Sequence, residues 1–176
     1  LATVSGTTSA AGVQTILPVP RVALASSSQV TAGTVNQGAV GHQLFRFTTA
    51  VTTANATMSS LSFVTAGTYA AIDVVNFRLW YNTSNDFTTA LQVGSPVIGS
   101  LGTGTHTFSG LNVNTAAGTT GYFWITTDIA PFPTNGRTIS INAITTGDIG
   151  YTLSAIESGS TRAGGAQTIT TVHGVL

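Results

Sequence analysis

The sequence has very few charged residues, and this excludes several classes of function. Only 6% of its 176 residues are charged, five arginines balance five acidic residues, and the formal net charge at pH 7 is 0. Binding to nucleic acid needs a dense cationic surface, and binding to an anionic membrane surface needs clustered Lys and Arg. The composition therefore argues against both partners. A neutral surface that is kept soluble by hydroxyls and amides instead favours association with other protein.

Cysteine is also absent, which excludes disulfides, thiolate catalysis and cysteine-based zinc sites. Long apolar runs are missing too, because Pro18, Pro20 and Arg21 interrupt the most hydrophobic stretch before it reaches the roughly 18 residues of a membrane-spanning helix. We therefore expect no membrane insertion. The chain begins with Leu1 and not with methionine, so we expect it to be processed or excised.

The densest block of aromatic and β-branched side chains runs over residues 119–130 and predicts a central strand. Pro131 and Pro133 follow it, and a strand stops where prolines remove backbone donors. The residues at 122, 124 and 126 would face one way and those at 123, 125 and 127 the other. Large side chains on both faces need cover on both, which the middle of a sandwich supplies.

No segment shows a sustained helical period with caps, so we predict an all-β chain. Turn-rich joins separate short apolar stretches at the spacing typical of an antiparallel two-sheet β-sandwich, Ig-like or jelly-roll-like. The predicted strands are 29–35, 42–51, 58–65, 74–81, 91–97, 105–109, 119–127, 137–146, 150–154 and 166–173, with one helical turn at 70–73.

Alternation of apolar and polar residues predicts which side chains are buried. Ile139, Ile141 and Ala143, for example, alternate with polar residues. The side chains that we expect to be mostly buried are Phe63, Phe77, Leu79, Phe123, Ile125, Ile139 and Ile141.

Three motifs resemble a known module in their identity and order: VNFRLWYNTSNDF at 75–87, GYFWITTDI at 121–129 and GGAQTI at 164–169. The sequence is similar to the domain at the N-terminus of some BNR-repeat sialidase-like proteins. That domain is repeated in large surface proteins that Bacteroidetes-type bacteria export by type IX secretion. The likeness covers roughly residues 25–169. It implies a fold similar to carbohydrate-binding β-sandwiches, surface display and an accessory or adhesive role, and it implies no reaction.

The two ends of the chain also resemble each other. Residues 6–16 and 159–169 align without a gap and share Gly, Thr, Ala, Gly, Gln, Thr and Ile. Low complexity in a chain rich in Thr, Gly and Ala explains part of such a likeness. The alternative is that the chain begins with a copy of the segment with which it ends. This is the pattern of one period of a tandem array, or of a subunit whose N-terminal strand docks where a terminal strand belongs.

We divide the chain into an extended N-terminal segment, 1–24, and a β-sandwich domain, 25–176. The segment is either a donor strand or the end of a preceding repeat. Its candidate assembly residues are Val13, Thr15, Ile16 and Leu17, which would pair with and insert along the sheet edge of a neighbouring module.

No catalytic constellation stands out in the sequence. His42, His106 and His173 lack metal-ligand spacing and are more typical of ordinary strand histidines. The acids are scattered, with Glu157 the sole glutamate. The five arginines are spread along the chain, so each is a more plausible partner for an acid than part of a cluster around a substrate carboxylate. We therefore predict that the chain is not an enzyme.

Two short motifs are candidates for binding or structural devices. The run from Asn82 to Asp86 offers oxygens to Ca²⁺, although an Asx-rich turn without metal is the commoner use of such a run. We expect no other cofactor. Residues 146–153 resemble the Asp-box of sialidase propellers, a hairpin device, but carry Leu153 where an aromatic residue is usual.

Trp80 is out of phase with Phe77, Leu79 and Tyr81, so one of these sets must face away from the core. Trp80 and Tyr69 are the candidate ligand-contact aromatics, although core or inter-module packing is the commoner role. We predict an extracellular, non-catalytic module of the bacterial cell surface that joins like modules head to tail in a filament or fibre. The alternative is a monomeric carbohydrate-binding accessory module with surface glycans as partners.

Overall fold

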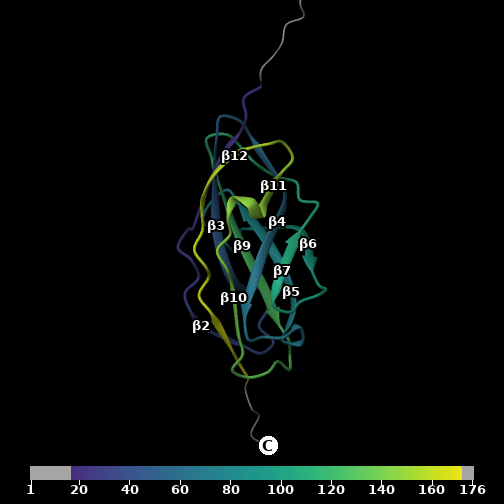
Figure 1. The fold of residues 1–176 in the computed structure, drawn as a ribbon. Helices are drawn as coiled ribbons and strands as arrows, with labels where there is room; N and C mark the ends of the chain where they lie inside the picture. The colour runs from purple at the N-terminus through teal and green to yellow at the C-terminus, as the bar shows by residue number, and fades with distance from the viewer. Residues whose placement is uncertain (1–16, 172–176) are drawn as a thin grey trace, which may run out of the picture.

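Two β-sheets packed face to face form the fold (Figure 1), and the computed structural model describes residues 17–171. The helical elements of this part of the chain are two 3₁₀ turns, η1 (Ala71–Asp73) and η2 (Thr146–Asp148). The prediction of an all-β sandwich is confirmed. No helix among the described residues has the length and apolarity needed to span a membrane.

Sheet A contains six strands in the order β12-β1-β3-β9-β5-β6. Their bounds are β1 Arg21–Ala25, β3 His42–Thr52, β5 Val74–Asn82, β6 Leu91–Val97, β9 Thr120–Ile129 and β12 Ile156–Ser160. Sheet B contains seven strands, with the path β11-β4-β10-β13-β2 and with β7 and β8 paired to β4. Their bounds are β2 Gly33–Asn36, β4 Ala56–Gly67, β7 Gly104–Phe108, β8 Val113–Thr115, β10 Thr138–Ile141, β11 Ile149–Tyr151 and β13 Gln167–Thr170.

Strand β9 is central, as its composition predicted. It pairs antiparallel with β3 on one side and with β5 on the other. Phe123 and Ile125 point into the sandwich, where the Phe123 ring stacks on Phe47 at 4.8 Å. Trp124 occupies the outer face and is nevertheless only 2% exposed, so something other than sheet B covers this face.

The core lies between the sheets and contains the side chains that alternation predicted. All seven of the predicted core residues are buried, and Phe77, Leu79 and Ile125 are completely so. Phe63 packs on both Phe77 and Phe108 in the core, with ring centroids 5.5 and 5.2 Å apart. The alternation predicted beyond Ile141 fails, since Ala143 is exposed.

Both sheets are mixed, because the two ends of the chain run alongside each other in parallel. β1 pairs parallel with β12 in sheet A, and β2 pairs parallel with β13 in sheet B. The other described pairings are antiparallel. β1 also places Arg21–Ala25 within sheet A, so the sandwich includes residues 21–24 of the segment assigned to the N-terminal extension.

The remaining strand predictions differ from the structure mainly in length. The strand predicted at 137–146 ends at Ile141, and the one predicted at 29–35 begins at Gly33. β1, β8 and β12 were not predicted; β8 has three residues, and the burial of Val22 and Leu24 in β1 comes from contacts with residues distant in the sequence. The predicted helical turn is η1.

The described chain enters and leaves the sandwich at opposite ends (Figure 1). We call the first the entry end, where Ile156 N–H donates to the Pro20 carbonyl and Thr53 Oγ1 donates to the Val19 carbonyl. We call the second the exit end, where Gln37 N–H donates to the Thr170 carbonyl. The loops 37–41, 68–73 and 130–137 gather at the exit end.

Candidate functional site

The connection between β5 and β6 folds over the outer face of sheet A. Its Phe87 ring lies 5.6 Å from the Trp80 ring and 5.7 Å from the Trp124 ring, centroid to centroid. This contact explains how Trp124 is buried on the side away from the core. The phase of the aromatic residues in the sequence indicated an aromatic outer face, but no sequence pattern indicated that the loop between β5 and β6 covers it.

An Asx-rich turn holds that loop in place. Asp86 accepts hydrogen bonds from Thr88 N–H, Thr88 Oγ1 and Thr89 Oγ1, and these bonds lower the pKa of Asp86. Asn82 donates to the Asp86 carbonyl at 2.7 Å and accepts from Ser84 N–H. The oxygens that a Ca²⁺ ion would need therefore already accept hydrogen bonds. The described residues contain no group of three or more His, Asp or Glu side chains placed to hold a metal.

Trp80 faces away from the core, as its phase predicted, and lines a hollow on the outer face. Its Nε1–H donates to Thr126 Oγ1 at 2.9 Å, which fixes the ring. The hollow has a volume of about 430 Å³ and is lined by Val40, Gly41, Arg78, Trp80, Phe87, Thr88 and Ala90. Its lining combines two aromatic rings with a guanidinium group.

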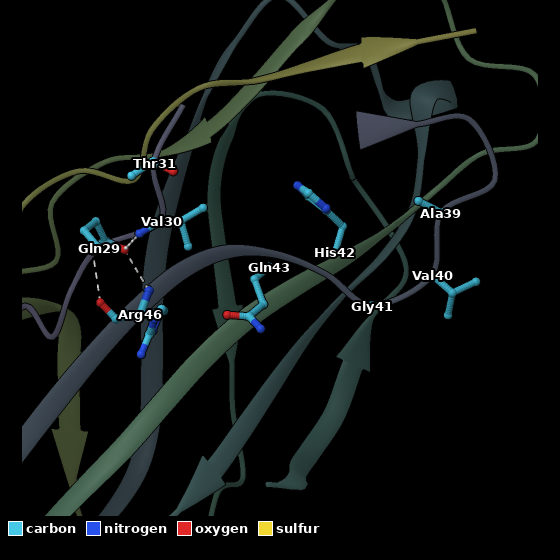
Figure 2. A pocket seen from close by; sticks show the side chains of 9 residues that line it. All are labelled: Gln29, Val30, Thr31, Ala39, Val40, Gly41, His42, Gln43 and Arg46. Carbon is cyan, nitrogen blue, oxygen red and sulfur yellow. Dashed lines mark hydrogen bonds between the residues drawn. The ribbon is translucent and has the colours of Figure 1, made fainter. Parts of the chain in front are cut away.

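A second hollow of about 660 Å³ adjoins the first, since both are lined by Val40 and Gly41. Figure 2 shows it between the start of β3 and residues 29–31, with His42 and Gln43 on opposite sides of the strand. Its full lining is Gln29, Val30, Thr31, Ala39, Val40, Gly41, His42, Gln43 and Arg46. We refer to the two hollows together as the outer groove.

Hydrogen bonds to two glutamines shape one wall of the outer groove. Gln29 accepts from the N–H groups of Val30 and Arg46 and donates to the Arg46 carbonyl (Figure 2). Gln167 lies 3.2 Å from His42 Nε2 and donates to the Thr31 carbonyl at 2.7 Å. Gln43, in contrast, makes no side-chain hydrogen bond within residues 17–171 and is available to a ligand.

The charges around the outer groove are only partly balanced. Arg78 pairs with Asp128 at 2.8 Å. Arg46 donates to Asn85 Oδ1 at 2.8 Å but has no acidic partner among the described residues, and its buried Nε has no hydrogen-bond partner there. The expectation that each arginine pairs with an acid is therefore wrong: within the described chain only Arg78 and Arg137 do so.

Tyr69, the second candidate contact aromatic, is buried and cannot serve as a surface platform. Its side chain is only 4% exposed. Its hydroxyl lies 2.6 Å from Thr65 Oγ1 and donates to the Gly102 carbonyl. Burial raises the pKa of Tyr69, and the Thr65 hydrogen bond opposes that rise. Tyr69 therefore belongs to the core, where its hydroxyl bridges β4 to the loop before β7.

The histidines of the described chain have structural partners. His106 is buried between the Phe63 and Phe77 rings, and its Nε2 lies 3.1 Å from Thr65 Oγ1. Burial lowers the pKa of His106. His42 contacts Gln167, as described above. His173 lies outside the described residues.

Tyr151 and Glu157 lie close enough for the Glu157 charge to act on the Tyr151 hydroxyl. Burial and the Glu157 charge both raise the pKa of Tyr151 far above its usual range, and its buried hydroxyl has no hydrogen-bond partner among the described residues. Burial also raises the pKa of Glu157. A tyrosine nucleophile needs a lowered pKa or an adjacent base with access to substrate, so these shifts disfavour the phenolate.

Residues 146–153, which resemble an Asp-box, form η2 and then β11. Asp148 Oδ2 accepts from both the N–H and the Oγ1 of Thr145 at 2.8 Å. Leu153 points to solvent with 70% of its surface exposed. The motif is thus a turn device here.

The candidate assembly residues Val13, Thr15 and Ile16 lie outside the described residues, while Leu17 is within them and is exposed. Residues 159–169, which 6–16 resembles in sequence, lie within the described part of the chain. They comprise the end of β12, a connection and most of β13. Gly159 has φ +83°, and a Cβ there would collide with the Leu24 carbonyl oxygen. A Cβ on Gly165 would collide with the backbone nitrogen of Ala32.

Comparison with known proteins gives a low-scoring likeness and no family. No family model matches the sequence, and no curated protein matches it. Among solved structures, the chain is similar to a chain of the CaDoc0917–CaCohA2 complex, with 13% identity, TM-score 0.35, and coverage of 85% of this chain and 99% of that one. It is also similar to a family 123 glycoside hydrolase from Clostridium perfringens, with 10% identity and TM-score 0.33. That match covers 88% of this chain but only 28% of the hydrolase. Scores this low carry no argument about function, and the chain is assigned to no family.

Proposed function

We propose that the chain is a non-catalytic structural module of the bacterial cell surface that joins like modules head to tail. In this proposal residues 1–16 take the place of β12 and β13 in a neighbouring module. The observation that carries it is where the identities between 6–16 and 159–169 fall in the structure. The extracellular surface location rests on the resemblance of the sequence motifs described above.

Five of the seven shared residues coincide with positions that the fold constrains, while the other two, Ala163 and Thr168, are exposed and half-buried. Thr161, Gln167 and Ile169 are buried, and Gly159 and Gly165 have no room for a Cβ. These five positions carry the same residue in 6–16. Low complexity would scatter identities without regard to burial, so this distribution supports a copied structural role.

The positions that differ are mostly exposed, which supports the same conclusion. Ser160, Arg162 and Ala166 face solvent, and Thr7, Ser9 and Val13 stand at the corresponding positions. The exception is Gly164, which is buried with its Cβ position against the Leu44 carbonyl oxygen, while Ala11 corresponds to it. A second copy of the chain that accepts Ala11 must therefore shift locally around Leu44.

The pairing of β13 bears on how the segment is accommodated. β13 is flanked by β10 and β2, so neither of its edges is open to an added strand. A copy of 159–169 must then replace this segment, which crosses from sheet A to sheet B, in a neighbour, or complete a module that lacks its own. Either arrangement joins two different surfaces and propagates as a chain of modules.

Deletion of residues 1–16 tests the proposal without touching the described sandwich. We expect the full chain to form ordered multimers by negative-stain microscopy and sedimentation velocity, and the truncated chain to remain monomeric with unchanged thermal unfolding. Identical multimers from both chains would contradict strand replacement.

A matched pair of substitutions sharpens that test. Gly12→Val adds a side chain where the corresponding Gly165 has no room for one, and should weaken assembly strongly. Val13→Ala changes a position whose counterpart, Ala166, is exposed, and should leave assembly unchanged. Equal effects from the two variants would count against the alignment.

The outer groove supports carbohydrate binding as a second candidate function. Trp80 and Phe87 offer ring faces. Within the described chain, the free amide of Gln43 and the guanidinium group of Arg46, which has no acidic partner, offer polar contacts along the adjoining hollow. Sugar-binding sites combine such features. A glycan array probed with the full chain at micromolar concentration tests this candidate. Binding that is lost in Trp80→Ala but kept in Leu91→Ala would favour it, and no binding at all would remove it.

A further inference from the structure

We infer that consecutive modules touch end to end, with the exit end of one module packed against the entry end of the next through exposed apolar side chains. This inference rests on the proposed function, because it takes the partner to be a second copy of the chain or a like module. It adds to that function a contact surface made by described residues outside the copied segment.

The exit end presents exposed apolar side chains on a rigid support. Phe132 is 91% exposed, and Ile72 and Val40 are largely exposed as well. The carboxylate of Asp73 holds the loop that carries Phe132, because it accepts from Thr134 N–H at 2.7 Å, and the main-chain carbonyl of Asp73 accepts from Ala130 N–H. A phenyl ring held in solvent by anchored backbone on both sides is typical of a contact surface.

The entry end presents a matching set of apolar side chains. Leu17 is 75% exposed, Leu153 is 70% exposed, and Val19 and Ile156 are about half exposed. The hydrogen bond from Ile156 N–H to the Pro20 carbonyl ties the entering chain to the loop that bears Leu153. Neither set includes a charged side chain, although Arg21, which is exposed and has no acidic partner among the described residues, lies beside Ile156 at the entry end.

The length of chain between modules leaves little room for a gap. Ile16 corresponds to Ile169, the last fully buried residue of β13, and only Leu17, Pro18, Val19 and Pro20 separate Ile16 from Arg21, where β1 begins. Five residue steps span at most about 18 Å. Prolines at two of the four positions favour a stiff, extended path. The linker therefore holds the exit end of one module close to the entry end of the next.

Two variants of the full chain, each altered at one end, test this contact. Phe132→Asp places a charge on the exit end, and Leu153→Asp places one on the entry end. Leu91→Asp is the control, since Leu91 is 73% exposed but lies on the edge strand β6, away from both ends. Thermal unfolding of each variant checks that the sandwich is intact. Sedimentation velocity over a concentration series measures association.

We expect Phe132→Asp and Leu153→Asp each to weaken association about tenfold or more, and Leu91→Asp to leave it unchanged. An equimolar mixture of the two end variants has one unaltered pair of ends, and should form dimers but no longer chains. If the parent chain assembles and both end variants assemble as well as Leu91→Asp, the end contact is overturned and the proposed function stands. If the mixture forms no dimers, the weakened ends do not face each other, and the inference fails. If the parent chain does not associate at all, the proposed function and this contact fall together.

Discussion

Asp73→Asn is the substitution that most directly tests how the exit end is held. Asp73 is fully buried. Its carboxylate accepts from Ala70 N–H and Thr134 N–H, each at 2.7 Å, and pairs with Arg137 at 3.2 Å. Asparagine has nearly the same shape, but it keeps one acceptor oxygen and directs an N–H group at the other backbone N–H. One strong hydrogen bond is lost, and two donors then face each other in a buried site.

The expected loss follows from these contacts. A hydrogen bond to a charged group contributes about 1.5–3 kcal/mol, and an unsatisfied buried donor costs about 1–3 kcal/mol. The Arg137 pair adds little, because the arginine side chain is 34% exposed and solvent screens the charge. We expect the free energy of unfolding to fall by about 3–5 kcal/mol. Urea unfolding at pH 7 measures this loss. A loss below about 1 kcal/mol for Asp73→Asn would refute the reasoning.

The second prediction concerns how the stability of the parent protein and of Asp73→Asn depends on pH. Burial tends to raise the pKa of Asp73, but the backbone hydrogen bonds and the Arg137 charge outweigh it, so the pKa lies below its ordinary value. A carboxylate with a depressed pKa stabilises the folded state above its unfolded-state pKa of about 3.9, and that stability is lost as the pH falls through the folded-state pKa. The stability difference between the parent and Asp73→Asn should be complete at neutral pH and shrink below about pH 4. A difference that stays constant down to about pH 2 would show that the carboxylate charge is not the cause.

Three further substitutions test other parts of the fold. His106→Gln should reduce the loss of stability on acidification. Burial lowers the pKa of His106, so the parent is fully stable above the unfolded-state pKa of about 6.5 and loses stability as the pH falls below it. Unfolding curves between about pH 5 and 7.5 measure this loss. Phe123→Ala should cost about 3–5 kcal/mol in urea unfolding, because the ring is buried against Phe47 and Tyr81, whereas Phe132→Ala in the exposed loop should cost almost nothing. Gly165→Val should lower the melting temperature, because its Cβ would meet the backbone nitrogen of Ala32. Ala166→Val should not, because that position is exposed. Equal melting temperatures for the two variants would contradict the close approach of Gly165 to Ala32.

The long strands could be predicted from the sequence because their patterns are local. β3, β4, β5, β6 and β9 each have enough alternation or aromatic content to be recognised alone, and their predicted ends fall within two residues of those observed. β1 and β12 are short, and their places in the sheet depend on pairing with strands more than twenty residues away in the sequence. Nothing in their own residues marks them as strands.

The candidate site was predicted less completely, for the same reason. The phase of Trp80 placed it correctly on the outer face, since phase is a local property. The burial of Tyr69 depends on Gly102 and on the loop before β7, which no local pattern identifies. The outer groove joins residues 29–46 to residues 78–90, so it exists only once the sheet has formed. The likeness of 6–16 to 159–169 was visible in the sequence, but which of its identities matter required the burial of Gln167 and the crowding at Gly165.

The parallel pairing at the chain ends explains why this fold suits a head-to-tail arrangement. The chain from β1 to β2 runs from the entry end to the exit end, and the chain from β12 to β13 runs beside it in the same direction. If the terminal strands ran antiparallel, as neighbours in a simple hairpin do, the chain would enter and leave at the same end. Because they run parallel, a segment that fills the place of β12 and β13 in one module leaves that module at its exit end and is directed away from it. Such a segment reaches Arg21 of the next module after four more residues. With this topology, a module that accepts the copied segment places the next module further along one axis. Repetition of that displacement builds a fibre.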